Sequence, residues 1–225
     1  MKSEGMKIAA GLVTVALMTG AGSAQAVTWE IMGKLTVEHA LQTPQELLSL
    51  EGTPFSAYLS YDENASPTST PSPEFTNYGN QGSFKVNTEM GTATGAFENL
   101  QTYIFVGPIT HASNFNGYGS QVGLTGPIAS LGLVTQAFDF QFQDLPLGGT
   151  GGLSDFALPS ELNLNEFNGS NFIRLSFLSA EGNPLDTRLL GVMDSVSAIP
   201  EPQTYMMLLA GLSLLGWRLR HTRGG

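Results

Sequence analysis

The 225-residue sequence contains no cysteine. This excludes disulfide bonds, thiol nucleophiles, zinc sites built on thiolates and dithiol redox motifs. An exported protein of this size does not need disulfides, because roughly 170 residues can bury an adequate hydrophobic core without them. Histidine is almost as rare, with only three in the chain.

Basic residues are scarce between the two ends of the chain. Residues 27–199 hold 17 of the 19 acidic residues but only four of the nine basic ones, so their formal charge is about −13 at neutral pH. Binding to nucleic acid requires clustered Lys and Arg that displace counterions from phosphates. The charge therefore excludes nucleic acid as a partner and disfavours anionic lipid surfaces. It favours solubility and leaves room for divalent cations.

Motifs of common catalytic sites are missing or uninformative. A serine hydrolase needs a Ser beside a His that a carboxylate orients. Only His39 and His111 lie between the two ends, and no G-x-S-x-G motif is present. Glycoside hydrolysis needs two carboxyl groups at a defined separation, and so many acidic residues make some pair unavoidable. We therefore predict a protein that is not an enzyme, with a carbohydrate-active enzyme as the alternative.

The N-terminus has the composition of a secretory signal peptide. A positively charged start is followed by a short apolar run, and Ala24-Gln25-Ala26 is an A-x-A cleavage site. Ala24 and Ala26 are thus the predicted determinants for signal peptidase. Residues 1–26 would be removed, and the mature chain would start near Val27.

The C-terminus combines an apolar run with a basic tail. Residues 206–217 carry no charge, and Trp217 stands where an interfacial aromatic belongs. We predict a transmembrane helix over 205–219, about 22 Å long, which is short against a bilayer core of about 30 Å. The basic residues that follow place the C-terminus in the cytoplasm by the positive-inside rule. They are Arg218, Arg220 and Arg223.

An accessible tripeptide precedes the apolar run. Pro200 and Pro202 flank Glu201 and keep it out of a regular helix. This order of tripeptide, apolar run and arginines, over residues 199–223, resembles the PEP-CTERM sorting signal of Gram-negative bacteria. Gln203 departs from the Ser or Ala that is more usual there.

The resemblance implies a processing route and a setting. In that family exosortase, a membrane transpeptidase, reads the signal and cuts near the tripeptide, and the producing cells typically make exopolysaccharide. We therefore expect transient anchoring in the inner membrane, then delivery to the cell surface or the extracellular space. The alternative is an unprocessed, tail-anchored periplasmic protein.

Short stretches of alternating apolar and polar residues fill the remainder, residues 27–198. No long helical periodicity is present there, and Gly, Pro and Asn mark the turns. We predict an all-β fold, a single β-sandwich or jelly-roll-like body, with one short helical segment at 44–50. The predicted strands cover 27–40, 55–61, 83–88, 92–97, 102–106, 118–124, 134–142, 172–178 and 189–196.

Two kinds of segment are candidate ligand sites. Asp62-Glu63-Asn64, and Asp144 with Asp155, offer the oxygen ligands that Ca²⁺ prefers, but ordinary loop solubility is the favoured explanation, so we assign no metal and no cofactor. Phe115-Asn116-Gly117-Tyr118 and Phe75-Thr76-Asn77-Tyr78 place aromatics beside Asn, as sugar-binding loops do, and as turns that plug a core also do. The sequence favours a structural or adhesive surface protein in contact with exopolysaccharide. A carbohydrate-binding module is an alternative.

Overall fold

The computed structural model describes residues 26–38, 43–68, 75–106, 111–145, 153, 155–178, 184–200, 209 and 211–213. Antiparallel strands dominate them, so the all-β prediction is confirmed. The elements in chain order are β1 (Ala26–Glu38), α1 (Gln45–Leu48), β2 (Pro54–Asp62), β3 (Phe75–Gly79), β4 (Gly82–Thr88), β5 (Gly91–Ala96), β6 (Asn99–Val106), β7 (His111–Gly119), β8 (Val122–Thr125), η1 (Pro127–Leu131), β9 (Val134–Asp144), η2 (Leu164–Glu166), β10 (Phe172–Leu178) and β11 (Pro184–Ile199).

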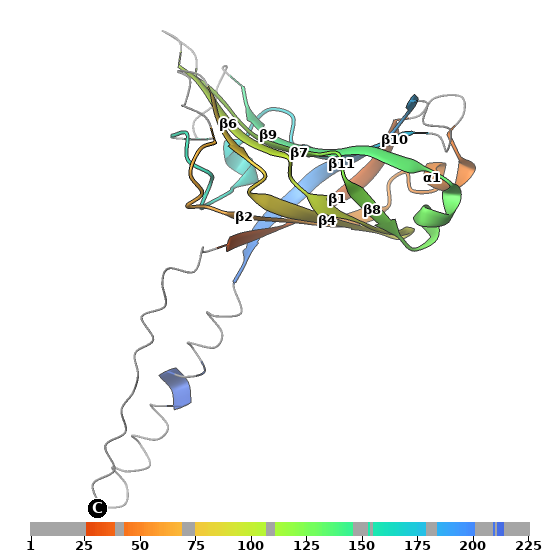
Figure 1. Cartoon of the computed structure of the whole chain (residues 1–225), viewed down its shortest axis with the longest axis horizontal. Helices are drawn as coiled ribbons and strands as arrows, with labels where there is room; N and C mark the ends of the chain where they lie inside the picture. The colour runs from red at the N-terminus through yellow and green to blue at the C-terminus, as the bar shows by residue number, and fades with distance from the viewer. Residues whose placement is uncertain are drawn as a thin grey trace, which may run out of the picture.

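All the described strands form one continuous sheet. Their order is β3-β6-β7-β9-β10-β11-β1-β2-β4-β5-β8, so β11 is the central strand and joins two groups of five. The sheet curls, and Figure 1 shows its two halves lying over one another. A sandwich in the strict sense has two separate sheets, whereas here the ladder runs from one layer into the other through β11.

A bulge lies where β1 pairs with β11. The register shifts between Met32 and Gly33. A Cβ atom at Gly33 would lie 1.9 Å from the carbonyl oxygen of Val192, so a larger residue would push the two strands apart. Glycine at this position therefore permits the close approach of β1 and β11.

Phenylalanine rings fill the space between the two halves. Phe138, Phe140 and Phe142 on β9 are all buried, as their alternation with polar residues predicts. The ring of Phe138 stacks on Phe84 of β4, with 4.0 Å between centroids. Phe115 of β7 meets Tyr61 of β2 edge to face at 5.4 Å. These contacts hold β7 and β9 in place, and with them the polar side chains on the opposite face of these strands.

Tyr61 connects the core to the loop before β10. Its hydroxyl accepts a hydrogen bond from Trp29 Nε1 and donates one to the carbonyl of Pro159, both at 2.8 Å. Thr102 Oγ1 donates to the carbonyl of Phe156 at 2.6 Å, which fixes the same loop to β6. Buried polar groups need such partners, because an unpaired one keeps the full cost of its lost hydration.

Three sequence predictions were wrong in detail. Residues 118–124 are not one strand, because the chain turns at Ser120 between β7 and β8. The two aromatic-plus-Asn segments expected in loops, as sugar-binding loops or as turns that plug a core, lie instead within strands β7 and β3. Gly117 suggested a turn, but it faces the core opposite Phe140, whose ring would lie 2.3 Å from a Cβ there. Glycine at position 117 therefore leaves the space that the Phe140 ring fills.

The two ends of the body lie side by side. Thr28 near the start of β1 pairs with Ile199, the last residue of β11. Figure 1 shows these two strands extending together beyond the rest of the sheet. Of the predicted span 205–219, only Leu209 and residues 211–213 are described, and they are helical. None of the described helices has the length and apolar character needed to cross a membrane, so the structure gives the predicted transmembrane helix no support.

Candidate functional site

The outer face of β7, β9 and β10 carries polar and aromatic side chains in register. Asp139 of β9 lies between Tyr118 of β7 and Arg174 of β10. Two residues along β9, Gln141 lies in the same way between Asn116 and Phe172. Because directly opposite residues share a face of the sheet, these side chains form two adjacent rows.

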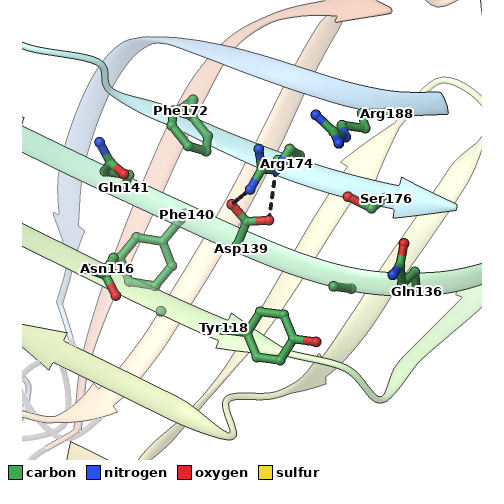
Figure 2. Close-up of a pocket in the computed structure, with 12 residues that line it drawn as sticks. Asn116, Tyr118, Gln136, Asp139, Phe140, Gln141, Phe172, Arg174, Ser176 and Arg188 are labelled. Atoms are coloured by element: carbon green, nitrogen blue, oxygen red, sulfur yellow. Dashed lines mark hydrogen bonds and ion pairs between the residues drawn. The ribbon is translucent and has the colours of Figure 1, made fainter. Parts of the chain in front are cut away.

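These rows line a shallow groove of about 390 Å³. Figure 2 shows the labelled side chains projecting from the strands around Asp139 and Arg174. Tyr118 is 43% exposed, so much of its side chain is accessible to a ligand. The groove is lined by Asn116, Gly117, Tyr118, Gln136, Ala137, Asp139, Phe140, Gln141, Phe172, Arg174, Ser176 and Arg188.

A β-bulge adds one of the amides. Ser176 of β10 pairs with Ala137, but the next residue, Phe177, pairs with Thr135, so Gln136 is the extra residue of β9. Gln136 is exposed and lines the groove. Bulges often redirect a side chain beside a functional site, and this one adds a third amide to Asn116 and Gln141.

An ion pair lies at the centre of the groove. Arg174 Nε donates to Asp139 Oδ2 at 2.9 Å, and Nη2 lies 2.9 Å from Oδ1, which makes a two-point contact. The guanidinium also lies over the Phe172 ring, 5.4 Å from its centroid. The side chain of Arg174 is therefore held in one orientation, with the rest of its N–H groups available to a ligand.

Burial raises the pKa of the Asp139 carboxyl above its ordinary value, and the hydrogen bond and charge of Arg174 oppose this rise. Arg188 lowers the same pKa by a smaller amount. The carboxyl group of Asp139 therefore binds its proton more tightly in the folded protein than in the unfolded chain. As the pH rises from the ordinary carboxyl range through the folded pKa, ionisation of Asp139 lowers the stability of the fold.

We expect Arg174→Met to raise the pKa of Asp139 further, because the substitution removes the group that most opposes burial. The pH at which ionisation of Asp139 lowers the stability of the fold would rise together with this pKa. Titration of the Asp139 carboxyl carbon by NMR measures this, and Arg188→Gln, as the control, should give a smaller rise in the same direction. An unchanged or lower pKa in Arg174→Met would contradict the assignment.

The structure brings together only some of the residues that were considered for sugar binding. Asn116 and Tyr118 line the groove, whereas Phe115 between the halves is buried. In the second segment Phe75 is exposed but is not part of the groove, and Tyr78 is buried. Sequence reasoning missed the main partners, Gln136, Asp139, Gln141, Phe172, Arg174 and Arg188, which belong to other strands. The alternation along β9 was the available signal, since it predicts that Asp139 and Gln141 share a face.

Two of the acidic residues that were considered as calcium ligands are engaged locally. Asp62 Oδ1 accepts from the backbone N–H of Asn64, and Asp155 Oδ1 from that of Ala157, each at 2.9 Å. Both contacts are the usual Asx turns of loops. Asp144 is buried at the end of β9. Over the described ranges no three carboxylate or histidine side chains lie close enough to hold a metal ion together.

A second, acidic hollow lies in the loop before β10. It measures about 290 Å³ and includes the side chains of Asp155, Glu161 and Glu166. Asp155 caps its own turn, and Glu166 Oε1 accepts from Asn163 at 3.3 Å. His111, considered above as a catalytic base, is the first residue of β7, and His39 lies outside the described residues.

The predicted processing residues flank the body. Ala26 is the first residue of β1 and pairs with Asp62. Pro200 is exposed and follows β11 directly, so the ladder ends where the tripeptide begins. The other residues assigned to signal-peptidase cleavage and sorting lie outside the described part of the chain. They are Ala24, Glu201, Pro202, Arg218, Arg220 and Arg223.

Comparison with protein families identifies this last segment. Residues 198–223 match the family model of the PEP-CTERM protein-sorting motif. The resemblance noted in the sequence is thus confirmed, and the motif supports an exported protein that exosortase sorts to the cell envelope or beyond. No curated protein and no solved structure matches the chain.

Proposed function

We propose that this exported PEP-CTERM protein is a non-catalytic, adhesive component of the cell surface or extracellular matrix. Its body binds extracellular polysaccharide through the groove on β7, β9 and β10. Before release, the segment 205–219 holds it transiently in the inner membrane. Sorting to the envelope follows from the motif, and the binding role is carried by the groove.

The observation that carries the binding role is the combination of an accessible aromatic ring with planar amides on one face. Tyr118 exposes its ring, and Asn116, Gln136 and Gln141 line the same groove. Sugars present apolar C–H faces beside hydroxyl groups that both donate and accept hydrogen bonds. An aromatic surface with amides beside it matches both features, because amides also donate and accept.

Binding without hydrolysis is supported by the carboxyl groups. A glycosidase that uses two carboxylates places them on either side of the scissile bond. Among the described residues that line the groove, Asp139 is the only acid, and Arg174 already occupies both of its oxygens. A carbohydrate-active enzyme is therefore the weaker proposal for this groove.

We expect Tyr118→Ala to weaken binding to the producing strain's exopolysaccharide about tenfold, equivalent to ~1.4 kcal/mol. The full chain would be titrated with the purified polymer by calorimetry, with reducing ends measured in parallel. Phe75→Ala is the matched control, because Phe75 is 44% exposed, almost as much as Tyr118, and lies outside the groove.

Equal losses in the two variants would remove the groove from the proposal. Release of reducing ends by the unaltered protein, but not by Tyr118→Ala, would favour the enzyme over the binding protein.

A further inference from the structure

Two of the four basic side chains of this acidic body lie at the groove. Between residues 27 and 199 the four are Lys34, Lys85, Arg174 and Arg188. Both arginines line the groove. Lys34 of β1 pairs with Val192, which lines another hollow that shares Phe172 and Arg174 with the groove. Lys85 is exposed on β4, which β2 separates from β1.

The two arginines differ in how their charges are balanced. Arg174 makes two contacts of 2.9 Å with Asp139. Arg188 lies 3.7 Å from Glu38, beyond hydrogen-bonding distance, and its side chain is 45% exposed. Such an exposed pair is weak and exchanges readily with other anions. Arg188 is therefore the cation at this groove whose charge is less fully balanced by a protein carboxylate, and an incoming anion can engage it more readily than Arg174.

We infer that the groove recognises an acidic polysaccharide, with a sugar carboxylate bound by Arg188 and a neighbouring ring lying against Tyr118. The inference rests on the proposed function and names its ligand class. β7 and β11 are three strand spacings apart, roughly 14 Å, which is wider than one sugar ring. The two residues thus contact different units of one polymer chain.

The charge of the body explains why this face would be needed. With a formal charge of about −13, the remaining surface repels a polyanion. An acidic polymer can approach closely only where cations offset that repulsion, and a guanidinium–carboxylate contact supplies a charge-assisted hydrogen bond. A neutral polymer feels no such repulsion and gains little from Arg188.

The test compares each polymer with its own neutral form. The full chain is titrated with alginate, polygalacturonate and hyaluronate, and with the same polymers after reduction of their carboxyl groups to alcohols. We expect at least one acidic polymer to bind more tightly than its reduced form. Arg188→Gln should weaken binding of that acidic polymer about tenfold and leave binding of the reduced polymer unchanged.

Two further variants separate a local contact from a general charge effect. Lys85→Gln removes the same charge on β4, away from the groove, and should leave binding unchanged. Glu38→Gln removes the carboxylate beside Arg188, so binding of the acidic polymer should become severalfold tighter. Opposite effects from the two members of one ion pair are not expected from mere loss of folding.

The outcomes distinguish the inference from the proposed function. Equal binding of acidic and reduced polymers, with no effect of Arg188→Gln, would overturn the inference and leave polysaccharide binding intact. Equal losses in Lys85→Gln and Arg188→Gln would also overturn it. Failure of every polymer, acidic or reduced, and of the producing strain's own exopolysaccharide would overturn the proposed function itself.

Discussion

Phe138→Ala is expected to lower the free energy of unfolding by about 3–5 kcal/mol, a large part of the total stability of a domain of this size. The side chain of Phe138 is fully buried. It stacks on Phe84 across the two halves of the sheet and touches Phe97 and Phe140. Alanine would leave a cavity between the halves that they cannot close, because the continuous strand pairing holds both halves in place. Denaturant unfolding measures the loss.

The control for this prediction lies on the same strand. Val134 is 50% exposed at the start of β9, so Val134→Ala should change stability by no more than about 0.5 kcal/mol. Equal losses in the two variants would mean that the ring stack does not join the two halves.

A chain that ends at Pro200 is expected to fold normally and to lose its sorting entirely. The ladder of β11 ends at Ile199, so no pairing of the sheet is removed, and stability should change by no more than about 0.5 kcal/mol. The deletion removes Glu201 and almost all of the sorting motif. Cell fractionation should find the truncated protein in the periplasm and the unaltered protein at the surface or in the medium.

Intact mass decides how the unaltered chain is processed. We expect a species that starts near Val27 and ends near the tripeptide 200–202. A species that retains Trp217 and the basic tail would contradict exosortase cleavage and leave a tail-anchored protein.

A chain that ends at Leu190 is the folding control for the truncation at Pro200. It loses most of the pairing between β1 and β11 and should be degraded.

Sequence reasoning succeeded where neighbouring residues determine the outcome. The alternation around Phe138, Phe140 and Phe142 predicts a half-buried strand because strand geometry imposes a period of two. The sorting motif was recognisable for a related reason, since its three parts follow one another directly along the chain.

The groove could not be predicted in this way, because it is assembled across strands. Arg174 meets Asp139 only through the register of β10 on β9, and the bulge at Gln136 depends on that register too. The Asn-Gly-Tyr sequence of β7 suggested a turn. Gly117 instead leaves room for the ring of Phe140, which belongs to a different strand and is not indicated by the local sequence. Registers between distant strands follow from the whole fold and not from local propensity.

The central position of β11 has a consequence for export. The last strand of the body to be synthesised is the one that joins its two groups of five strands. An exported chain leaves the translocation channel N-terminus first, so β1 and β10 wait with unpaired edges until β11 arrives. Exposed edges invite pairing with other chains, and contacts as distant in sequence as Thr28 with Ile199 form slowly. A periplasmic chaperone that shields strand edges would therefore matter most before β11 arrives. That period ends only when the residues beside the sorting signal have crossed the membrane.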